Sequence, residues 1–273
     1  MDTRLELGVT RLGPGVFRRQ MEALARAGVR TLGSAELEAL VTARPAMGQG
    51  GPLSPPHASP LTSLTSVVLT FDDAYAALAA HAFPVLAGLG LKALVFVITD
   101  FAGRENSWDV QYGWRGFRHL AWDDLALWRD RGVIEVHAHG AIHARLTWLP
   151  DALVEQELGR ARETIAARLG GAPAGFCYPF GAVDARVLRL TRAAGYRLGF
   201  AGPRGVPGAL PADAPLALAR RPVYAWDAFA RPCVLREGAA GALAMAAARL
   251  ANRIAVGTSI IRRISGARAP GHG

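Results

Sequence analysis

The sequence predicts an α/β fold in which parallel strands and crossover helices build a distorted (β/α) barrel. Short apolar runs, typical of buried strands, alternate along the chain with longer segments in which apolar residues recur at helical spacing. Many such units follow one another, as a barrel requires. Hydrophobic residues make up 51% of the 273 residues, so the chain can bury a sizeable core.

The predicted elements begin near residue 14. The first helix starts close to Pro14 and ends at Gly28, in keeping with the preference of proline for helix starts and of glycine for helix ends. Ser34 is the predicted N-cap of a second helix, with Glu36 in its first turn, and Pro84 predicts a kink in the third. The predicted helices are 14–28, the segment after Ser34, Ala76–Leu89, Trp122–Arg131, Asp151–Leu169 and Asp184–Ala194. The predicted strands are Val29–Leu32, Ser66–Phe71, Lys92–Ile98, Val133–Val136, Gly175–Tyr178 and Tyr196–Ala201.

We expect one barrel domain over residues 1–232 and a helical, basic extension over 233–273. A Pro-, Gly- and Ser-rich stretch at 43–64 is predicted to be a loop of the barrel domain, because it is too short to mark a domain boundary. In the extension, leucines and isoleucines are interleaved with arginines. This pattern suits either a helix packed on the barrel or a basic amphipathic helix on a membrane surface or against a partner.

The chain is basic, with a formal net charge of +9, and Lys92 is its single lysine. The arginines are scattered along the predicted helices, which indicates either a preference for Arg over Lys or attraction to a polyanion or an anionic membrane. No nucleic-acid-binding motif accompanies the charge, so no nucleic-acid partner is expected. Neither a signal peptide nor a transmembrane segment is recognisable, which favours a cytoplasmic or membrane-peripheral location.

Two adjacent carboxylates, Asp72 and Asp73, come directly after the apolar run Val67–Leu69 and residues Thr70 and Phe71. Carboxylates at the end of a buried strand are costly unless something compensates their charge. A metal ion is one compensation. The other interpretation is a strand exit with solvated aspartates, in which Asp73 starts the next helix.

Three of the seven histidines gather after the predicted strand Val133–Val136, namely His137, His139 and His143. His139 and His143 are four residues apart, so a helical turn or a tight loop can direct both at one ion. One aspartate and two histidines supply the three ligands of a typical catalytic zinc site, which keeps a fourth position for a water of lowered pKa. The remaining carboxylate can act as a general base.

A third segment, F-C-Y-P-F-G at 176–181, is a strand that runs into a Pro/Gly turn. Backbone N–H groups in such a turn can stabilise an oxyanion, although the segment also suits an ordinary turn. Together with T-F-D-D at 70–73 and E-V-H-A-H-G-A-I-H at 135–143, it resembles the ordered motifs of the polysaccharide deacetylase family. The resemblance covers roughly residues 14–225.

The resemblance implies a distorted parallel barrel and a role for each motif residue. Asp72 would be the catalytic base. The backbone N–H of Phe180 would help to hold the oxyanion, with Tyr178 beside it in the substrate site. A divalent metal, with zinc as the expected ion, would be bound by Asp73, His139 and His143.

The sequence departs from the family pattern beside the Pro/Gly turn. Many members carry an arginine there that orients the catalytic base, whereas this chain has Cys177. Arg220 resembles an arginine that some members supply from a later strand, and we expect it to pair with Asp72. Arg221 is the alternative, as is a surface position for Arg220.

Two further departures concern histidine and the His loop. Many members have a late histidine that protonates the leaving amine, and here the only histidine after His143 is His272, in a Pro/Gly-rich tail. His137 is the nearest candidate for the general acid, or else a packed histidine, and His119 is a weaker one. Gly140 stands where the family has Ser or Thr, so a hydroxyl that would help to fix the His loop is missing.

These observations predict a metal-dependent hydrolase that removes N-acetyl or O-acetyl groups from an amino-sugar glycan, with an acetylated oligo- or polysaccharide as its substrate. Two alternatives remain. One is a hydrolase of non-sugar C–N bonds, and the other is a catalytically silent barrel that binds glycan. The aromatic-rich loop 101–122 is predicted either to form a wall of the substrate site or to pack on itself.

Overall fold

The computed structural model describes residues 12–43, 66–105, 117–203 and 205–223, without 207, 208, 210 and 222 in the last range. The predicted extension at 233–273 lies outside these ranges, together with its expected helix and membrane contact. So do nearly all of the predicted loop at 43–64 and most of the aromatic-rich loop.

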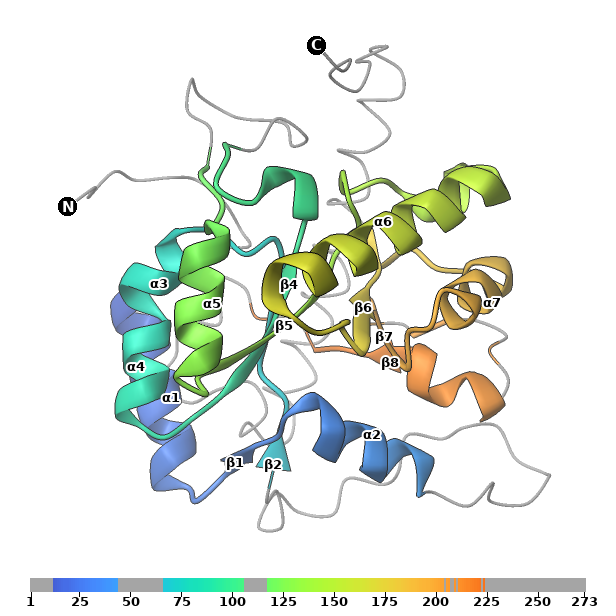
Figure 1. Cartoon of the computed structure of the whole chain (residues 1–273). Helices are drawn as coiled ribbons and strands as arrows, with labels where there is room; N and C mark the ends of the chain where they lie inside the picture. Colours follow the sequence, from blue (N-terminus) through green and yellow to red (C-terminus); the bar gives the residue numbers. More distant parts are fainter. Residues whose placement is uncertain are drawn as a thin grey trace.

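The centre of the fold is a parallel sheet of six strands in the order β3-β4-β5-β6-β7-β8, curled into a half-barrel (Figure 1). A separate two-stranded parallel pair joins β1 to β2. The strand order follows the chain, because each crossover helix returns the chain to the next parallel position. The predicted barrel-type α/β fold is thereby confirmed. The strands are β1 (Arg30–Thr31), β2 (Ser66–Val67), β3 (Thr70–Phe71), β4 (Ala93–Val97), β5 (Ile134–Ala138), β6 (Gly175–Cys177), β7 (Leu198–Ala201) and β8 (Leu218–Ala219).

Helices flank the sheet, with α3, α4 and α5 to one side of β4 and β5 and with α6 and α7 near β6 and β7 (Figure 1). The α-helices are α1 (Pro14–Arg26), α2 (Ser34–Thr42), α3 (Ala77–His81), α4 (Phe83–Gly88), α5 (Trp122–Asp130), α6 (Asp151–Leu169) and α7 (Ala185–Ala193). Short 3-10 turns are η2 (Thr99–Phe101), η3 (Leu146–Trp148), η4 (Pro179–Gly181) and η5 (Pro211–Leu216).

Strand β4 shows how both faces of the sheet are buried. Ala93, Val95 and Val97 belong to the large core that includes side chains of the crossover helices. Leu94 and Phe96 belong to a second cluster, against which Leu37 and Val41 of α2 pack. Such burial on both faces explains why this strand reads as a continuous apolar run.

Three predicted elements differ in detail. The run Ser66–Phe71 is two strands, because β2 pairs with β1 whereas β3 pairs with β4. The helix at 76–89 is divided into α3 and α4 beside Pro84, which has no N–H to donate within a helix. The N-cap of α2 is Gly33 rather than Ser34, so Glu36 occupies the third helical position and accepts a hydrogen bond from the Gly33 amide at 3.0 Å.

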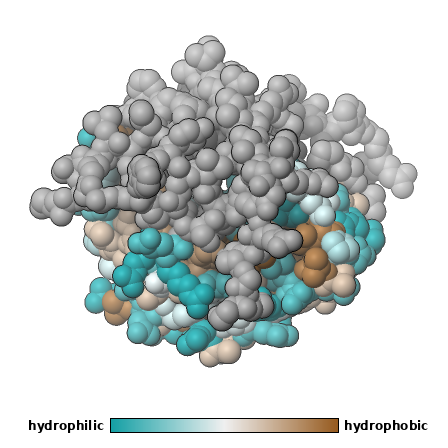
Figure 2. Space-filling view, turned by 90° about the horizontal axis from the view of Figure 1, so that it is seen from above, coloured by the Kyte–Doolittle hydropathy of each residue, from teal (hydrophilic) through white to brown (hydrophobic). Residues whose placement is uncertain are grey.

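On the part of the described surface that Figure 2 shows, hydrophilic residues predominate and hydrophobic residues form separate groups (Figure 2). Within the described ranges, no helix has both the length and the apolar character that crossing a membrane requires.

Candidate metal centre and active site

The predicted site residues follow three strands of the six-stranded sheet. Asp72 and Asp73 follow β3, His139 follows β5, and Cys177 ends β6. Parallel strands all end at the same edge of a sheet, which is where such barrels place their chemistry. These residues, which are far apart in sequence, lie together at this edge.

The three predicted metal ligands converge. The Asp73 Oδ1 atom lies 3.5 Å from His139 Nε2 and 3.6 Å from His143 Nε2, and the three ligand atoms lie within 4.8 Å of one another. Tetrahedral ligands at about 2.0–2.1 Å from a zinc ion lie roughly 3.4 Å apart. The spacing and the one-carboxylate, two-imidazole donor set therefore fit a divalent metal such as zinc.

Asp73 and His143 both adopt left-handed backbone conformations, with φ of 66° and 60°. Residues other than glycine adopt this region at a cost, and such residues concentrate at functional sites. His119 helps to hold the strained Asp73 segment, because its Nδ1 donates to the Asp73 carbonyl. The Leu120 amide also donates to the Ala74 carbonyl at 2.7 Å. His119, considered from the sequence as a weak general-acid candidate, is 1% exposed and supports the ligand loop instead.

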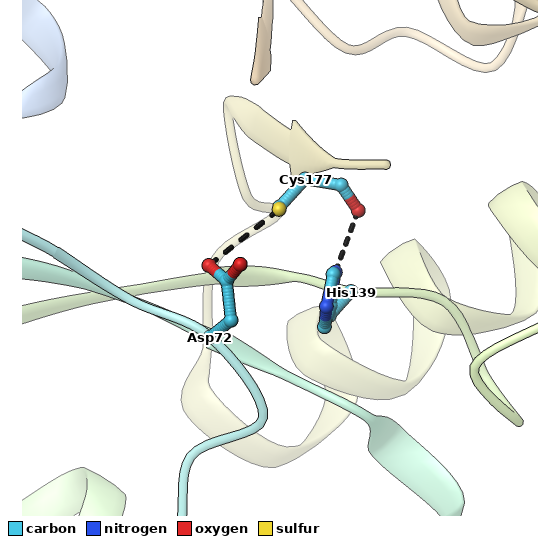
Figure 3. Close-up of side chains that lie close together, drawn as sticks. All are labelled: Asp72, His139 and Cys177. Atoms are coloured by element: carbon cyan, nitrogen blue, oxygen red, sulfur yellow. Dashed lines mark hydrogen bonds between the residues drawn. The ribbon is translucent and has the colours of Figure 1, made fainter. Parts of the chain in front are cut away.

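The orientation of His139 is set by the backbone of Cys177. His139 Nδ1 donates to the Cys177 carbonyl oxygen at 2.7 Å (Figure 3). That bond places the proton on Nδ1 and leaves Nε2, which faces Asp73, with its lone pair. Burial lowers the pKa of His139, which favours the neutral, metal-binding form. This support was not predicted, because a backbone carbonyl leaves no signal in the residue types.

Asp72 forms a two-bond ion pair with Arg220. The Nη1 and Nη2 atoms of Arg220 lie 2.6 and 2.8 Å from the two carboxylate oxygens. Arg220 also donates to Thr70 Oγ1 at 3.2 Å. Burial alone would raise the pKa of Asp72, but the Arg220 guanidinium holds it well below its usual range. The predicted contact is thus present at Arg220, whereas Arg221 is exposed.

A second group of close ligand-type atoms comprises Asp72, His139 and Cys177 (Figure 3). The Cys177 thiol donates to Asp72 Oδ1 at 3.6 Å, and Arg220 already occupies both oxygens of that carboxylate. Burial raises the pKa of the Cys177 thiol well above its usual value, so the thiol stays protonated, whereas metals bind thiolates. The donor set with Asp73 suits a metal better.

The Pro/Gly turn after β6 lies against the ligands. Phe180 has a φ of 60°, and its ring centroid lies 4.6 Å from that of His143. The oxyanion role of the Phe180 amide stays a prediction.

The predicted place of the Tyr178 side chain in the substrate site is not supported. Tyr178 is fully buried in the large core, and its hydroxyl donates to the Leu216 carbonyl at 3.0 Å. Successive side chains of a strand point to opposite faces. Cys177 faces Asp72, so the next side chain points away from the site.

His137 also lies in surroundings different from those of a general acid. Its Nε2 lies 3.5 Å from Glu135 Oε2, and its Nδ1 accepts from the Gly175 amide at 3.3 Å. The side chain is in register with Phe96 of β4, and the residue is 4% exposed. These contacts describe a packed histidine below the strand ends, so the structure does not support His137 as the proton donor.

Comparisons with known proteins agree with this fold. The pattern of the polysaccharide deacetylase family matches residues 62–199. YxkH of Bacillus subtilis (strain 168), itself only provisionally named a polysaccharide deacetylase, is 24% identical over 133 residues. That match spans 49% of this chain and 43% of the relative, so the chain covers less than half of the relative's length.

Two solved structures share the fold of this chain. The Streptococcus pyogenes deacetylase PplD, solved in complex with acetate, is 18% identical with a TM-score of 0.63, over 80% of this chain and 84% of that one. IcaB from Ammonifex degensii is 24% identical with a TM-score of 0.58, over 72% and 79% of the two chains.

Proposed function

Because this chain belongs to the polysaccharide deacetylase family, we propose that it is a metal-dependent hydrolase that removes N-acetyl or O-acetyl groups from an amino-sugar glycan. One observation carries the proposal: Asp73, His139 and His143 converge on one point, beside a carboxylate that is kept ionised by its own arginine. An acetylated oligo- or polysaccharide is the substrate class, and zinc is the expected ion.

Each residue of the site has a distinct task in this reaction. A divalent ion bound by Asp73, His139 and His143 would supply Lewis acidity and a water of lowered pKa. Asp72 accepts the proton of the attacking water, and Arg220 keeps its carboxylate ionised and oriented for that task. The Phe180 amide donates to the substrate carbonyl oxygen as negative charge develops there. No described histidine is assigned to protonation of the leaving amine.

The test is acetate release from an acetylated chitooligosaccharide by purified protein reconstituted with Zn²⁺. We expect turnover that a chelator abolishes and that Zn²⁺ restores. An O-acetylated glycan and a simple non-sugar amide, tested in parallel, separate ester, sugar-amide and general amide hydrolysis. Binding of the glycan without any acetate release would contradict the proposal and favour a catalytically silent barrel.

A further inference from the structure

A buried carboxylate of α6 holds the loop that carries the two histidines. Glu157 is 7% exposed, and its Oε2 atom accepts hydrogen bonds from the amides of Ala141 at 3.0 Å and Ile142 at 3.2 Å. Both amides lie between His139 and His143. Burial of a carboxylate is costly unless it is hydrogen-bonded, and here much of that cost is offset by contacts with this one loop.

The same loop is also held by η2. The Thr99 amide donates to the Gly140 carbonyl at 3.2 Å, and the Asp100 amide donates to the Ala141 carbonyl at 3.1 Å. Two carbonyl groups of the loop therefore accept hydrogen bonds from η2, and two amide groups of the loop donate hydrogen bonds to Glu157. A loop fixed through both kinds of backbone group has little freedom to move either histidine.

The absence of a side chain at Gly140 leaves room for the Glu157 carboxylate. Gly140 has a φ of +84°, and a Cβ atom placed on it would lie 3.1 Å from Glu157 Oε2. A side chain at 140 would therefore both strain the backbone and press on the carboxylate. The glycine lets the carboxylate approach the two amides. Glu157 of α6 therefore supports the loop in place of the hydroxyl that is missing at position 140.

We propose that Glu157 is a positioning residue of the metal centre: it fixes the 139–143 loop so that both histidine nitrogens face one ion, without binding the ion itself. This inference rests on the proposed metal site. Glu157 acts as a hydrogen-bond acceptor, and a single oxygen accepts both bonds. An amide oxygen at the same position can therefore take its place, whereas an apolar side chain cannot.

The test compares metal affinity among variants of the full chain, measured by Zn²⁺ titration of the metal-free protein against a chromophoric chelator. Partners that orient metal-binding histidines typically change metal affinity 10–100-fold. We expect Glu157→Leu to weaken Zn²⁺ binding by about 10–100-fold and Glu157→Gln to stay within about threefold of the parent, since the amide oxygen preserves both acceptor bonds. Glu155→Leu is the matched control, because Glu155 is an exposed residue of the same helix, and it should bind Zn²⁺ like the parent.

Each outcome separates this inference from the proposed function. Parent protein that fails to bind Zn²⁺ would overturn the metal site itself. Parent-like affinity in Glu157→Leu would overturn only the positioning role, as would a Gln variant as weak as the Leu variant. If Glu157→Leu does not fold, Glu157→Asp provides the test, because the shorter side chain draws the oxygen away from both amides. Zn²⁺ binding as tight as in the parent would then refute the role.

Discussion

The Arg220 guanidinium and the Asp72 carboxylate, 148 residues apart in the chain, form two hydrogen bonds at 2.6 and 2.8 Å. Arg220 reaches the carboxylate from the end of β8 and also lies 3.0 Å from the Cys177 sulfur. A two-bond pair of this kind fixes both the charge and the direction of a carboxylate. We therefore treat it as the arrangement that prepares Asp72 to accept a proton.

The first prediction follows from this pair. Arg220→Ala removes the charge that keeps the pKa of Asp72 low, so that pKa should rise. The base is active when ionised, so the acid limb of the pH–rate profile should move to higher pH. Zn²⁺ content should not change, because Arg220 is not a ligand. Arg221→Ala is the control, and an unaltered profile for Arg220→Ala would count against the assignment.

The second prediction separates the two adjacent aspartates. Asp73→Ala should lose Zn²⁺ and activity together, because it removes one of three ligands. Asp72→Asn should retain Zn²⁺ and lose roughly 10²-fold or more in kcat, the scale of general base catalysis. The Zn²⁺ content and the initial rate of each variant, measured on the same preparation, test both expectations. Equal loss of metal in both variants would contradict the two roles.

The third prediction concerns the thiol in the site. Cys177 is fully buried and burial raises its pKa, so the reactive thiolate is scarce in the folded protein. In a Cys233→Ser background, the native protein should resist a thiol-specific reagent near pH 8, and the denatured protein should react with one equivalent. Rapid labelling of the native protein would show that Cys177 is accessible.

The fourth prediction concerns Tyr178. Tyr178→Phe removes the donor to the Leu216 carbonyl and should lower the free energy of unfolding by about 1–3 kcal/mol, with kcat/KM unchanged. Tyr196→Phe is a matched comparison, because the Tyr196 hydroxyl donates to the Leu158 carbonyl at the same 3.0 Å. Denaturant unfolding and steady-state rates give the answer. A fall in kcat/KM without loss of stability would contradict this prediction and support a role for Tyr178 in the substrate site.

Patterns among neighbouring residues were sufficient to predict the α/β fold class of this protein. Apolar runs and helical spacing predicted the alternation of strands and helices as far as β7, because both periodicities depend on neighbouring residues. They did not predict the division of Ser66–Phe71 into β2 and β3, or β8. Asp72 and Asp73 follow one predicted strand, and His139 and His143 follow another. Since parallel strands end at one edge of a sheet, the sequence by itself brought these four residues to the same edge.

Contacts between distant segments decided the rest. The choice of Arg220 over Arg221 and the burial of Tyr178 depend on which face of a strand each side chain takes, and a shift of one residue reverses that face. The role of Glu157 depends on α6 lying against a loop 15–16 residues earlier. The Cys177 carbonyl orients His139 through the backbone, which any residue type supplies. Only the packed structure determines such relationships, because they depend on direction in space and not on residue type.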